Sequence, residues 1–215
     1  MINAELQVFH NWVFRYRSAT IRPSRLLVML HGWTGDEDSM WVFARTLPAH
    51  VAVLAPRGPN VIPEGGFSWS EKNPESLELP AVDNFRKSAD ALIDFVDEWS
   101  KTVGVSSDQI DLIGFSQGAA LAYVLTIFHP EKIRALAALS GFLPAGMEKM
   151  LVERPLKGKP VYVAHGRQDE LIPVEKARKA VELLKSAGAE VTYCESEGGH
   201  KVSVSCFSEL EVMFG

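Results

Sequence analysis

The chain has few cysteines and no spacing of residues that suits a metal ion, and each shortage excludes a class of protein. Its only cysteines, Cys194 and Cys206, do not make the disulfide framework of a small secreted domain. A reduced, cytoplasmic setting is therefore expected. Neither cysteine lies at a metal-ligand spacing, and no cluster of His, Cys and Asp resembles a zinc site. We expect neither a metal nor another cofactor.

Long apolar runs and basic clusters are also missing. The longest clean apolar run near the start, residues 26–30, is far too short to cross a bilayer, so no membrane span is expected. The first five residues contain no basic stretch leading into an apolar one, which predicts no signal peptide. The net charge is −5 and the basic residues are scattered, so the sequence lacks the basic patch expected of a nucleic-acid-binding protein.

What the chain does have is the composition of an ordinary globular protein. It contains 215 residues, of which 47% are apolar and 23% charged. This length fits one domain with a full core, and no internal repeat or low-complexity tract divides it. We therefore predict a single domain over residues 1–215.

Buried strand patterns alternate with amphipathic helix patterns along the chain. The clearest helix is residues 83–102, where Phe85, Leu92 and Trp99 recur at helical spacing and Gly104 ends the pattern. The predicted strands are residues 6–17 (one strand or a hairpin), 26–30, 51–55, 110–113, 133–140, 161–164 and 191–194; further helices are predicted at 39–47, 119–125, 174–187 and 202–214. This alternation predicts an α/β fold, a mostly parallel sheet with helices on both faces.

Two irregular segments interrupt the alternation, at residues 56–82 and 141–159. Loops of this length inside a compact domain are usually functional. Phe67 and Trp69 are unusual in a solvated loop. They either anchor the loop on the core or form the wall of a pocket, and the sequence leaves both open.

The most informative stretch is Gly114-Phe115-Ser116-Gln117-Gly118, between a predicted strand and a predicted helix. Strand, Gly-x-Ser-x-Gly and helix together form the pattern of a nucleophile elbow. The serine sits on a sharp, strained turn, so the residues two places either side must be small. The helix that follows offers unpaired N–H groups to a developing anion. The alternative is a Gly/Ser turn in an ordinary strand–helix connection.

Two later residues favour the elbow interpretation. Asp169 and His200 each follow a predicted strand, and the order Ser116, Asp169, His200 is the order expected with this elbow. The carboxyl ends of parallel strands meet at one edge of a sheet, so these side chains should converge there. His200 would then act as general base, and Asp169 would orient it. Taken alone, each could be a turn residue.

An oxyanion hole needs two N–H donors. We predict the backbone N–H of Gln117 as one and Trp33, in the loop after residues 26–30, as the other. His31 and His165 each precede a glycine at a strand end, and we interpret both as structural.

These motifs resemble a known family. Five segments are similar, in matching order, to the phospholipase/carboxylesterase branch of the α/β-hydrolases. They are Leu30–Asp36, Gly114–Gly118, Ala138–Pro144, His165–Pro173 and Gly199-His200. That branch includes acyl-protein thioesterases and small bacterial carboxylesterases. The resemblance implies a Ser116–Asp169–His200 triad, Trp33 and Gln117 as oxyanion donors, and no large lid domain. Ala119 replaces a second glycine found in many members, and Trp33 is bulkier than the usual residue.

We therefore predict a serine carboxylesterase that cleaves small to medium acyl esters through an acyl-enzyme. Residues 56–82 resemble the carboxylesterases more than the thioesterases, but an acyl thioesterase or lysophospholipase remains an alternative. A non-catalytic ligand-binding module of the same fold is an alternative of another class. The expected partner is a small-molecule ester, and the chain acts as a monomer or homodimer. The predicted acyl-binding residues are Trp33, Trp41, Phe67, Trp69, Phe142 and Leu171.

Overall fold

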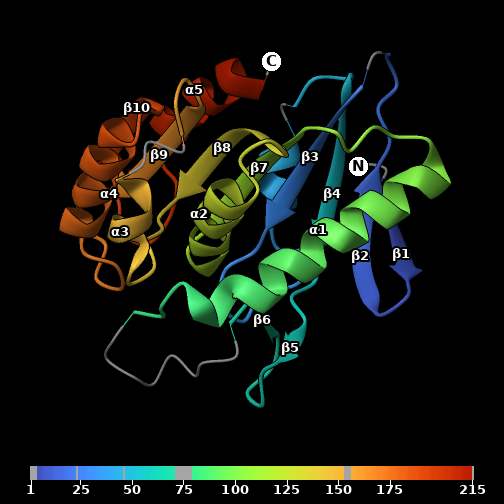
Figure 1. The fold of residues 1–215 in the computed structure, drawn as a ribbon, viewed down its shortest axis with the longest axis horizontal. Helices are drawn as coiled ribbons and strands as arrows, with labels where there is room; N and C mark the ends of the chain where they lie inside the picture. Colours follow the sequence, from blue (N-terminus) through green and yellow to red (C-terminus); the bar gives the residue numbers. More distant parts are fainter. Residues whose placement is uncertain (1–3, 23, 46, 71–78, 153–155, 215) are drawn as a thin grey trace.

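A computed structural model describes residues 4–22, 24–45, 47–70, 79–152 and 156–214. Its centre is an eight-stranded sheet with the strand order β1-β2-β4-β3-β7-β8-β9-β10 (Figure 1). The strands are β1 (Glu5–Phe9), β2 (Trp12–Arg17), β3 (Arg25–Leu30), β4 (Val51–Pro56), β7 (Ile110–Phe115), β8 (Ile133–Leu139), β9 (Pro160–Gly166) and β10 (Glu190–Ser196). The α/β fold predicted from the alternation is confirmed.

Most neighbouring strands in this sheet run parallel. The six strands from β4 to β10 pair in parallel, whereas β1 and β2 form an antiparallel hairpin that adds to β4. The hairpin settles the choice left open for residues 6–17. Because β3, β7, β9 and β10 all point the same way, the loops that follow them emerge at one edge of the sheet.

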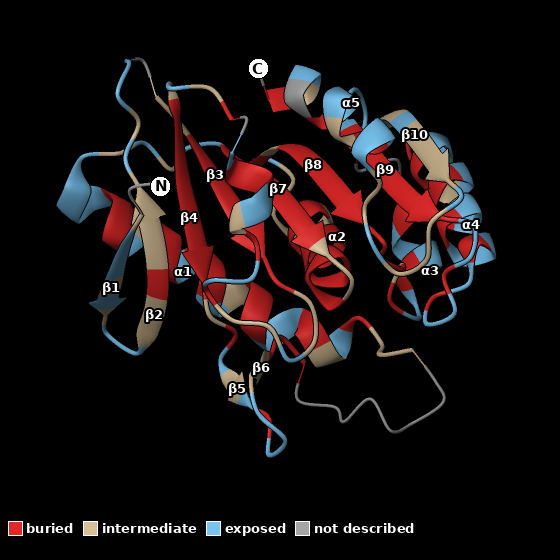
Figure 2. Ribbon diagram, turned by 180° about the vertical axis from the view of Figure 1, so that it is seen from behind, coloured by how far each residue is buried: buried red, intermediate tan, exposed pale blue. Residues whose placement is uncertain are grey.

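Helices cover both faces of the sheet, as predicted. One face carries α1 (Asp83–Val103), α2 (Gln117–Phe128), α3 (Met147–Leu151) and α4 (Val174–Ser186), and the other carries the short 3-10 helix η1 (Trp41–Ala44) and α5 (Val204–Phe214) (Figure 1). The central strands are almost entirely buried, and the outward sides of α1 and α4 are exposed (Figure 2). Phe85, Leu92 and Trp99 are buried on α1, and Gly104 ends that helix with a φ of 66°.

Some predicted elements differ from the structure. Of the helix predicted at 39–47, the described residues form only the 3-10 turn η1, and residue 46 lies outside the described part of the chain. The irregular segment at 56–82 contains a small antiparallel pair, β5 (Asn60–Val61) and β6 (Phe67–Ser68). Residues 71–78 of that segment lie outside the described part of the chain. The second irregular segment contains α3.

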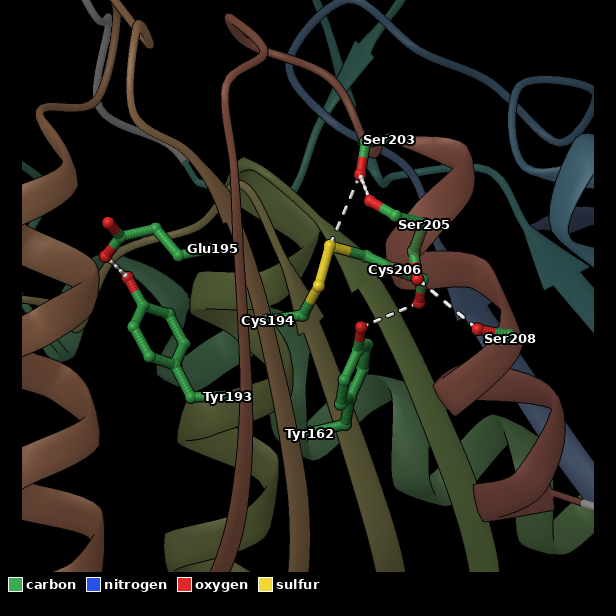
Figure 3. Close-up of a disulfide and its surroundings, with 8 residues drawn as sticks. All are labelled: Tyr162, Tyr193, Cys194, Glu195, Ser203, Ser205, Cys206 and Ser208. Atoms are coloured by element: carbon green, nitrogen blue, oxygen red, sulfur yellow. Dashed lines mark hydrogen bonds between the residues drawn. A yellow bond between two sulfur atoms is a disulfide. The ribbon is translucent and has the colours of Figure 1, made fainter.

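The structure bonds Cys194 of β10 to Cys206 of α5 in a disulfide (Figure 3). The reduced state expected for the two cysteines is therefore wrong. The two Cα atoms lie 5.7 Å apart although the residues are 12 positions apart in the sequence, because the chain turns back between β10 and α5. Within the described residues, no helix is both long and apolar enough to cross a membrane.

Candidate active site

Ser116 lies on a sharp turn between β7 and α2. Its backbone has φ 51° and ψ −113°, a conformation that a residue with a side chain rarely adopts. The flanking glycines make the turn possible. A Cβ on Gly114 would lie 2.4 Å from the carbonyl oxygen of Gly118, and a Cβ on Gly118 would lie 2.1 Å from that of Leu30. Both glycines are therefore required by close backbone approach, as the sequence pattern predicts.

The structure brings Ser116, His200 and Asp169 into one hydrogen-bonded chain. His200 Nε2 lies 3.0 Å from Ser116 Oγ, and His200 Nδ1 lies 2.8 Å from Asp169 Oδ2. Each residue comes from the loop after a different strand, β7, β10 and β9. The ring of Phe115 packs against the imidazole, with centroids 5.1 Å apart. In this arrangement the imidazole can take the serine proton while the carboxylate holds the tautomer.

The Asp169 carboxylate is buried and well supplied with hydrogen-bond donors. Its Oδ1 atom accepts the backbone N–H groups of Leu171 at 3.0 Å and Ile172 at 2.9 Å. His165 Nε2 donates to the carbonyl of Ile172 at 2.8 Å, and it lies 3.3 Å from Asp169 Oδ2. His165 therefore braces the loop that carries Asp169, which agrees with its interpretation as a structural residue.

Two backbone N–H groups in the loops after β3 and β7 have no described acceptor. Gln117 is the first residue of α2, so its N–H has no acceptor within that helix. Among the described residues, the N–H of Trp33 also has no acceptor. Gly32 allows this loop to approach closely, because a Cβ there would meet the Phe115 ring at 3.1 Å. These two donors are the pair predicted for the oxyanion hole.

His31 fixes the shape of the Trp33 loop. Its Nδ1 donates to the carbonyl of Gly32 at 2.7 Å, and its Nε2 accepts the N–H of Gly58 at 2.9 Å. Burial lowers the pKa of His31, and the Nε2 atom must be unprotonated to accept this bond. The neutral imidazole therefore ties the loop after β3 to the segment after β4, again a structural role.

The side chain of Gln117 has a role that the sequence does not reveal. Its Oε1 accepts the N–H of Trp69 at 2.9 Å, and its Nε2 donates to Ser68 Oγ at 3.0 Å. The Ser68 hydroxyl in turn donates to the carbonyl of Ser70 at 2.8 Å. This buried network fastens the β6 strand to the start of α2. No short motif marks it, because its partners are 48 residues apart.

A cavity of about 500 Å³ lies beside this constellation. It reaches Trp33, Phe115 next to Ser116, and Lys201 next to His200. Its other walls are largely apolar and come from the segment 34–43, from Val202 before α5 and from α5 itself, and they include Met40, Phe43 and Phe207. The rings of Phe43 and Phe207 stack with centroids 5.2 Å apart, which joins η1 to α5 at the cavity wall.

The predicted acyl-binding residues do not all reach a cavity. Trp33 lines the one beside Ser116. Leu171 is 70% exposed and lines a second cavity of about 640 Å³ between the Asp169 loop, α3 and α4. Trp41 and Phe67 are half-buried and line neither: Trp41 Nε1 donates to the carbonyl of Glu37, and the Arg57 guanidinium covers the Phe67 ring at 4.4 Å.

The predictions for Trp69 and Phe142 as substrate walls are wrong. Trp69 has no exposed surface, and its indole N–H donates to the carbonyl of His31 at 2.9 Å. Phe142 is 5% exposed and belongs to the main core. Both aromatic rings anchor loops on the core, which is the alternative that the sequence left open for residue 69. Among the described residues, no group of three or more His, Cys, Asp and Glu side chains could hold a metal ion.

The sequence and the fold are similar to those of known proteins. The model of the Phospholipase/Carboxylesterase family matches residues 15–212. The chain is 31% identical to acyl-protein thioesterase 1 of Kluyveromyces lactis, over 76% of this chain and 78% of that protein. It is also 31% identical to acyl-protein thioesterase 1 of Saccharomyces cerevisiae, over 79% and 82%. The structure of a carboxylesterase from Mesorhizobium loti is similar, with a TM-score of 0.80, 24% identity and 98% of each chain covered.

Proposed function

The chain belongs to the phospholipase/carboxylesterase family and is an ester hydrolase of the α/β-hydrolase fold, and from this premise we propose that Ser116, His200 and Asp169 form its catalytic triad. One observation carries the proposal: His200 contacts both of the other residues. Its Nε2 lies 3.0 Å from Ser116 Oγ, and its Nδ1 lies 2.8 Å from Asp169 Oδ2. A serine whose hydroxyl contacts an oriented imidazole is the activated nucleophile of acyl transfer.

In the proposed reaction, Ser116 Oγ attacks the carbonyl carbon of a small or medium acyl ester. Its proton moves to His200 Nε2, and the N–H groups of Gln117 and Trp33 stabilise the tetrahedral oxyanion. The intermediate collapses to an acyl-enzyme, and His200 returns the proton to the departing alcohol. Water then attacks the acyl-enzyme while its proton passes to His200. The second tetrahedral intermediate collapses, His200 returns the proton to Ser116 Oγ, and the acid is released. Asp169 stabilises the imidazolium in both steps.

We assign the acyl chain to the cavity beside Ser116, because Met40, Phe43 and Phe207 give it apolar walls. The oxyanion donors lie on the same side, since Trp33 contributes to both features. The cavity next to Leu171 would then take the alcohol part of the ester. The substrate is a small molecule, and the proposal treats residues 1–215 as one domain.

Substitution of the triad tests the proposal. Ser116→Ala should remain folded and lose hydrolysis of p-nitrophenyl acetate and butyrate, together with labelling by a fluorophosphonate probe. The exposed Ser106 offers a matched control, and Ser106→Ala should be unchanged. His200→Ala and Asp169→Ala should each lose orders of magnitude in kcat, non-additively with Ser116→Ala. Normal turnover by Ser116→Ala would refute the assignment of the nucleophile. If the folded wild-type protein did not react with the fluorophosphonate probe, it would be a ligand-binding module.

A thioesterase activity is the second candidate, because relatives with 31% identity bear the name acyl-protein thioesterase 1. The same triad serves oxygen esters and thioesters. The test compares oxygen esters and thioesters that carry the same acyl chain. The ratio of their kcat/KM values, measured over a series of acyl lengths, decides between these functions. A lysophospholipid substrate in the same series tests the remaining alternative.

A further inference from the structure

The disulfide between Cys194 and Cys206 encloses the segment that carries the proposed catalytic base. Cys194 is in β10, Cys206 is in α5, and they are 12 residues apart, so His200 stands midway between them. Figure 3 shows the bond joining the strand directly to the helix. We call residues 195–205 the base segment.

The two halves of the base segment are held differently. Before His200, the carbonyl of Ser196 accepts the N–H of Arg167 at 2.7 Å, and that of Gly198 accepts the N–H of Gln168 at 3.0 Å. After His200, the backbone hydrogen bonds described for residues 201–203 are local, from Lys201 to Gly199 and from Cys206 to Ser203. This second half is therefore fixed mainly where α5 begins, and that is where the disulfide is attached.

The same half also forms part of the acyl cavity. Lys201 and Val202 line it, and so does Phe207, the residue after Cys206. The position of Cys206 therefore bears both on the contact of His200 with Ser116 and on the cavity wall. The Tyr162 hydroxyl also donates to the carbonyl of Cys206 at 2.6 Å, which ties the start of α5 to β9 (Figure 3).

When this disulfide is reduced, the sulfur of Cys206 is better placed than that of Cys194 to leave as a thiolate. Cys206 is 1% exposed, so its sulfur is shielded from direct attack by a reductant. It is also the third residue of α5, where the helix N-terminus favours negative charge. The Ser203 hydroxyl donates to Cys206 Sγ at 3.3 Å (Figure 3). Cys194 is only partly buried. Attack on Cys194 with departure of Cys206 is thus the favoured direction, because a stabilised thiolate leaves faster.

We propose that the Cys194–Cys206 disulfide is a redox switch on the proposed esterase. The oxidised form holds the base segment with His200 against Ser116 and is the active form. Reduction by a dithiol releases the second half of the segment, so that His200 and the cavity wall lose their alignment. This inference rests on the proposed function, because the controlled residue is its general base.

The reduction is a two-electron exchange. One thiolate of the dithiol attacks Cys194 Sγ, the S–S bond breaks, and its electron pair goes to Cys206 as a thiolate. The second thiol of the reagent then displaces Cys194 from the mixed disulfide. The dithiol ends as a disulfide, and the protein holds two thiols after Cys194 and Cys206 each take up a proton.

The test compares the two redox states of the wild-type protein. The chain is purified without reductant, its thiols are counted with a chromogenic disulfide, and p-nitrophenyl butyrate hydrolysis is measured before and after dithiothreitol. Full reduction should expose two thiols and lower kcat about tenfold to a hundredfold, the loss expected from a misplaced catalytic group. Oxidation with diamide should restore the rate. Full reduction without a change in kcat or KM would overturn the switch, as would a disulfide that resists dithiothreitol in the folded protein.

Two variants separate the switch from general damage. The double variant Cys194→Ser, Cys206→Ser should be slow and unaffected by dithiothreitol. Ser203→Ala should keep the oxidised rate but be reduced more slowly, because its Cys206 thiolate lacks a donor. Equal reduction rates in Ser203→Ala and wild type would contradict the assigned leaving group. Failure of the proposed function is recognised separately, as no turnover and no fluorophosphonate labelling in either redox state.

Discussion

The side-chain carbonyl of Gln117 accepts the backbone N–H of Trp69 at 2.9 Å. This bond joins the residue after the proposed nucleophile to the loop whose indole donates to the carbonyl of His31. The two proposed oxyanion loops, after β3 and after β7, are therefore both fastened to residues 68–70. Gln117 is thus proposed to serve the site in two ways: its backbone N–H is a proposed oxyanion donor, and its side chain holds the surrounding loop.

We expect Gln117→Ala to lower stability more than catalysis. The backbone N–H remains, but the buried N–H of Trp69 loses its acceptor, which should cost about 1–3 kcal/mol in the free energy of unfolding. Urea denaturation measures this cost, and kcat should fall far less than in Ser116→Ala. Coupling with Ser68→Ala in a double-mutant cycle should be non-zero, since both belong to one network. A loss of kcat equal to that of Ser116→Ala, with normal stability, would show that the side chain acts in the reaction.

We expect Ser116→Gly to be more stable than Ser116→Ala. At φ 51° and ψ −113° any side chain is strained, and glycine removes that strain, which is worth about 1–3 kcal/mol. Both variants lack the nucleophile, so their unfolding free energies can be compared without regard to activity. Gly198→Ala provides a contrast, because a Cβ there meets no atom closer than 3.7 Å and should change stability little. Equal stability of the two Ser116 variants would mean that the elbow is relaxed in solution.

Much of the framework could be predicted because it depends on local patterns. The buried strands appear in the sequence as continuous apolar runs, and α1 appears as apolar residues at helical spacing. Gly114 and Gly118 mark the sharp turn at Ser116. Parallel strands place the loops after them at one edge of the sheet. Ser116, Asp169 and His200 could therefore be predicted to converge, because each follows a predicted strand and their order matches the elbow.

The remaining features depend on contacts that no local pattern encodes. Cys194 and Cys206 meet because the base segment folds back, and the sequence between them does not specify that path. Trp69 looks like a pocket residue in an irregular loop, but its burial depends on a bond to His31 across 38 positions. The cavity proposed for the acyl chain combines the Trp33 loop, η1 and α5, which come from separate parts of the chain.

Substitutions in the two cavities should separate acyl from alcohol preference. Phe207→Ala removes the ring stacked on Phe43, so the cavity beside Ser116 becomes larger and the preference should shift toward longer acyl chains. Leu171→Ala lies in the other cavity and should leave the acyl series unchanged while altering the preference for the alcohol. The measurement is kcat/KM for p-nitrophenyl esters of increasing acyl length and for butyrate esters of different alcohols. A shift of the acyl optimum in Leu171→Ala instead would reverse the assignment.

Glu195, the first residue of the base segment, should make stability sensitive to acid. Hydrogen bonds from Arg178, Tyr193 and Arg167 hold the pKa of Glu195 well below its usual value of 4.5, and its side chain is only 13% exposed. A carboxylate with a lowered folded-state pKa stabilises the protein above about pH 4.5 and loses that contribution as the pH falls through the range below it. Glu195→Gln should therefore be less stable at neutral pH, by about 1–3 kcal/mol, and should lose less stability on acidification than wild type.

Urea denaturation at neutral pH and at about pH 3 tests this, with Glu197→Gln as the matched control. Glu197 also pairs with Arg167, but its side chain is 70% exposed, so water competes for the ion pair and the substitution should change little. If Glu195→Gln and wild type lose stability in parallel on acidification, Glu195 is not the titrating group. If instead they converge at low pH, the carboxylate beside Cys194 anchors the first half of the base segment, while the disulfide and α5 hold the second.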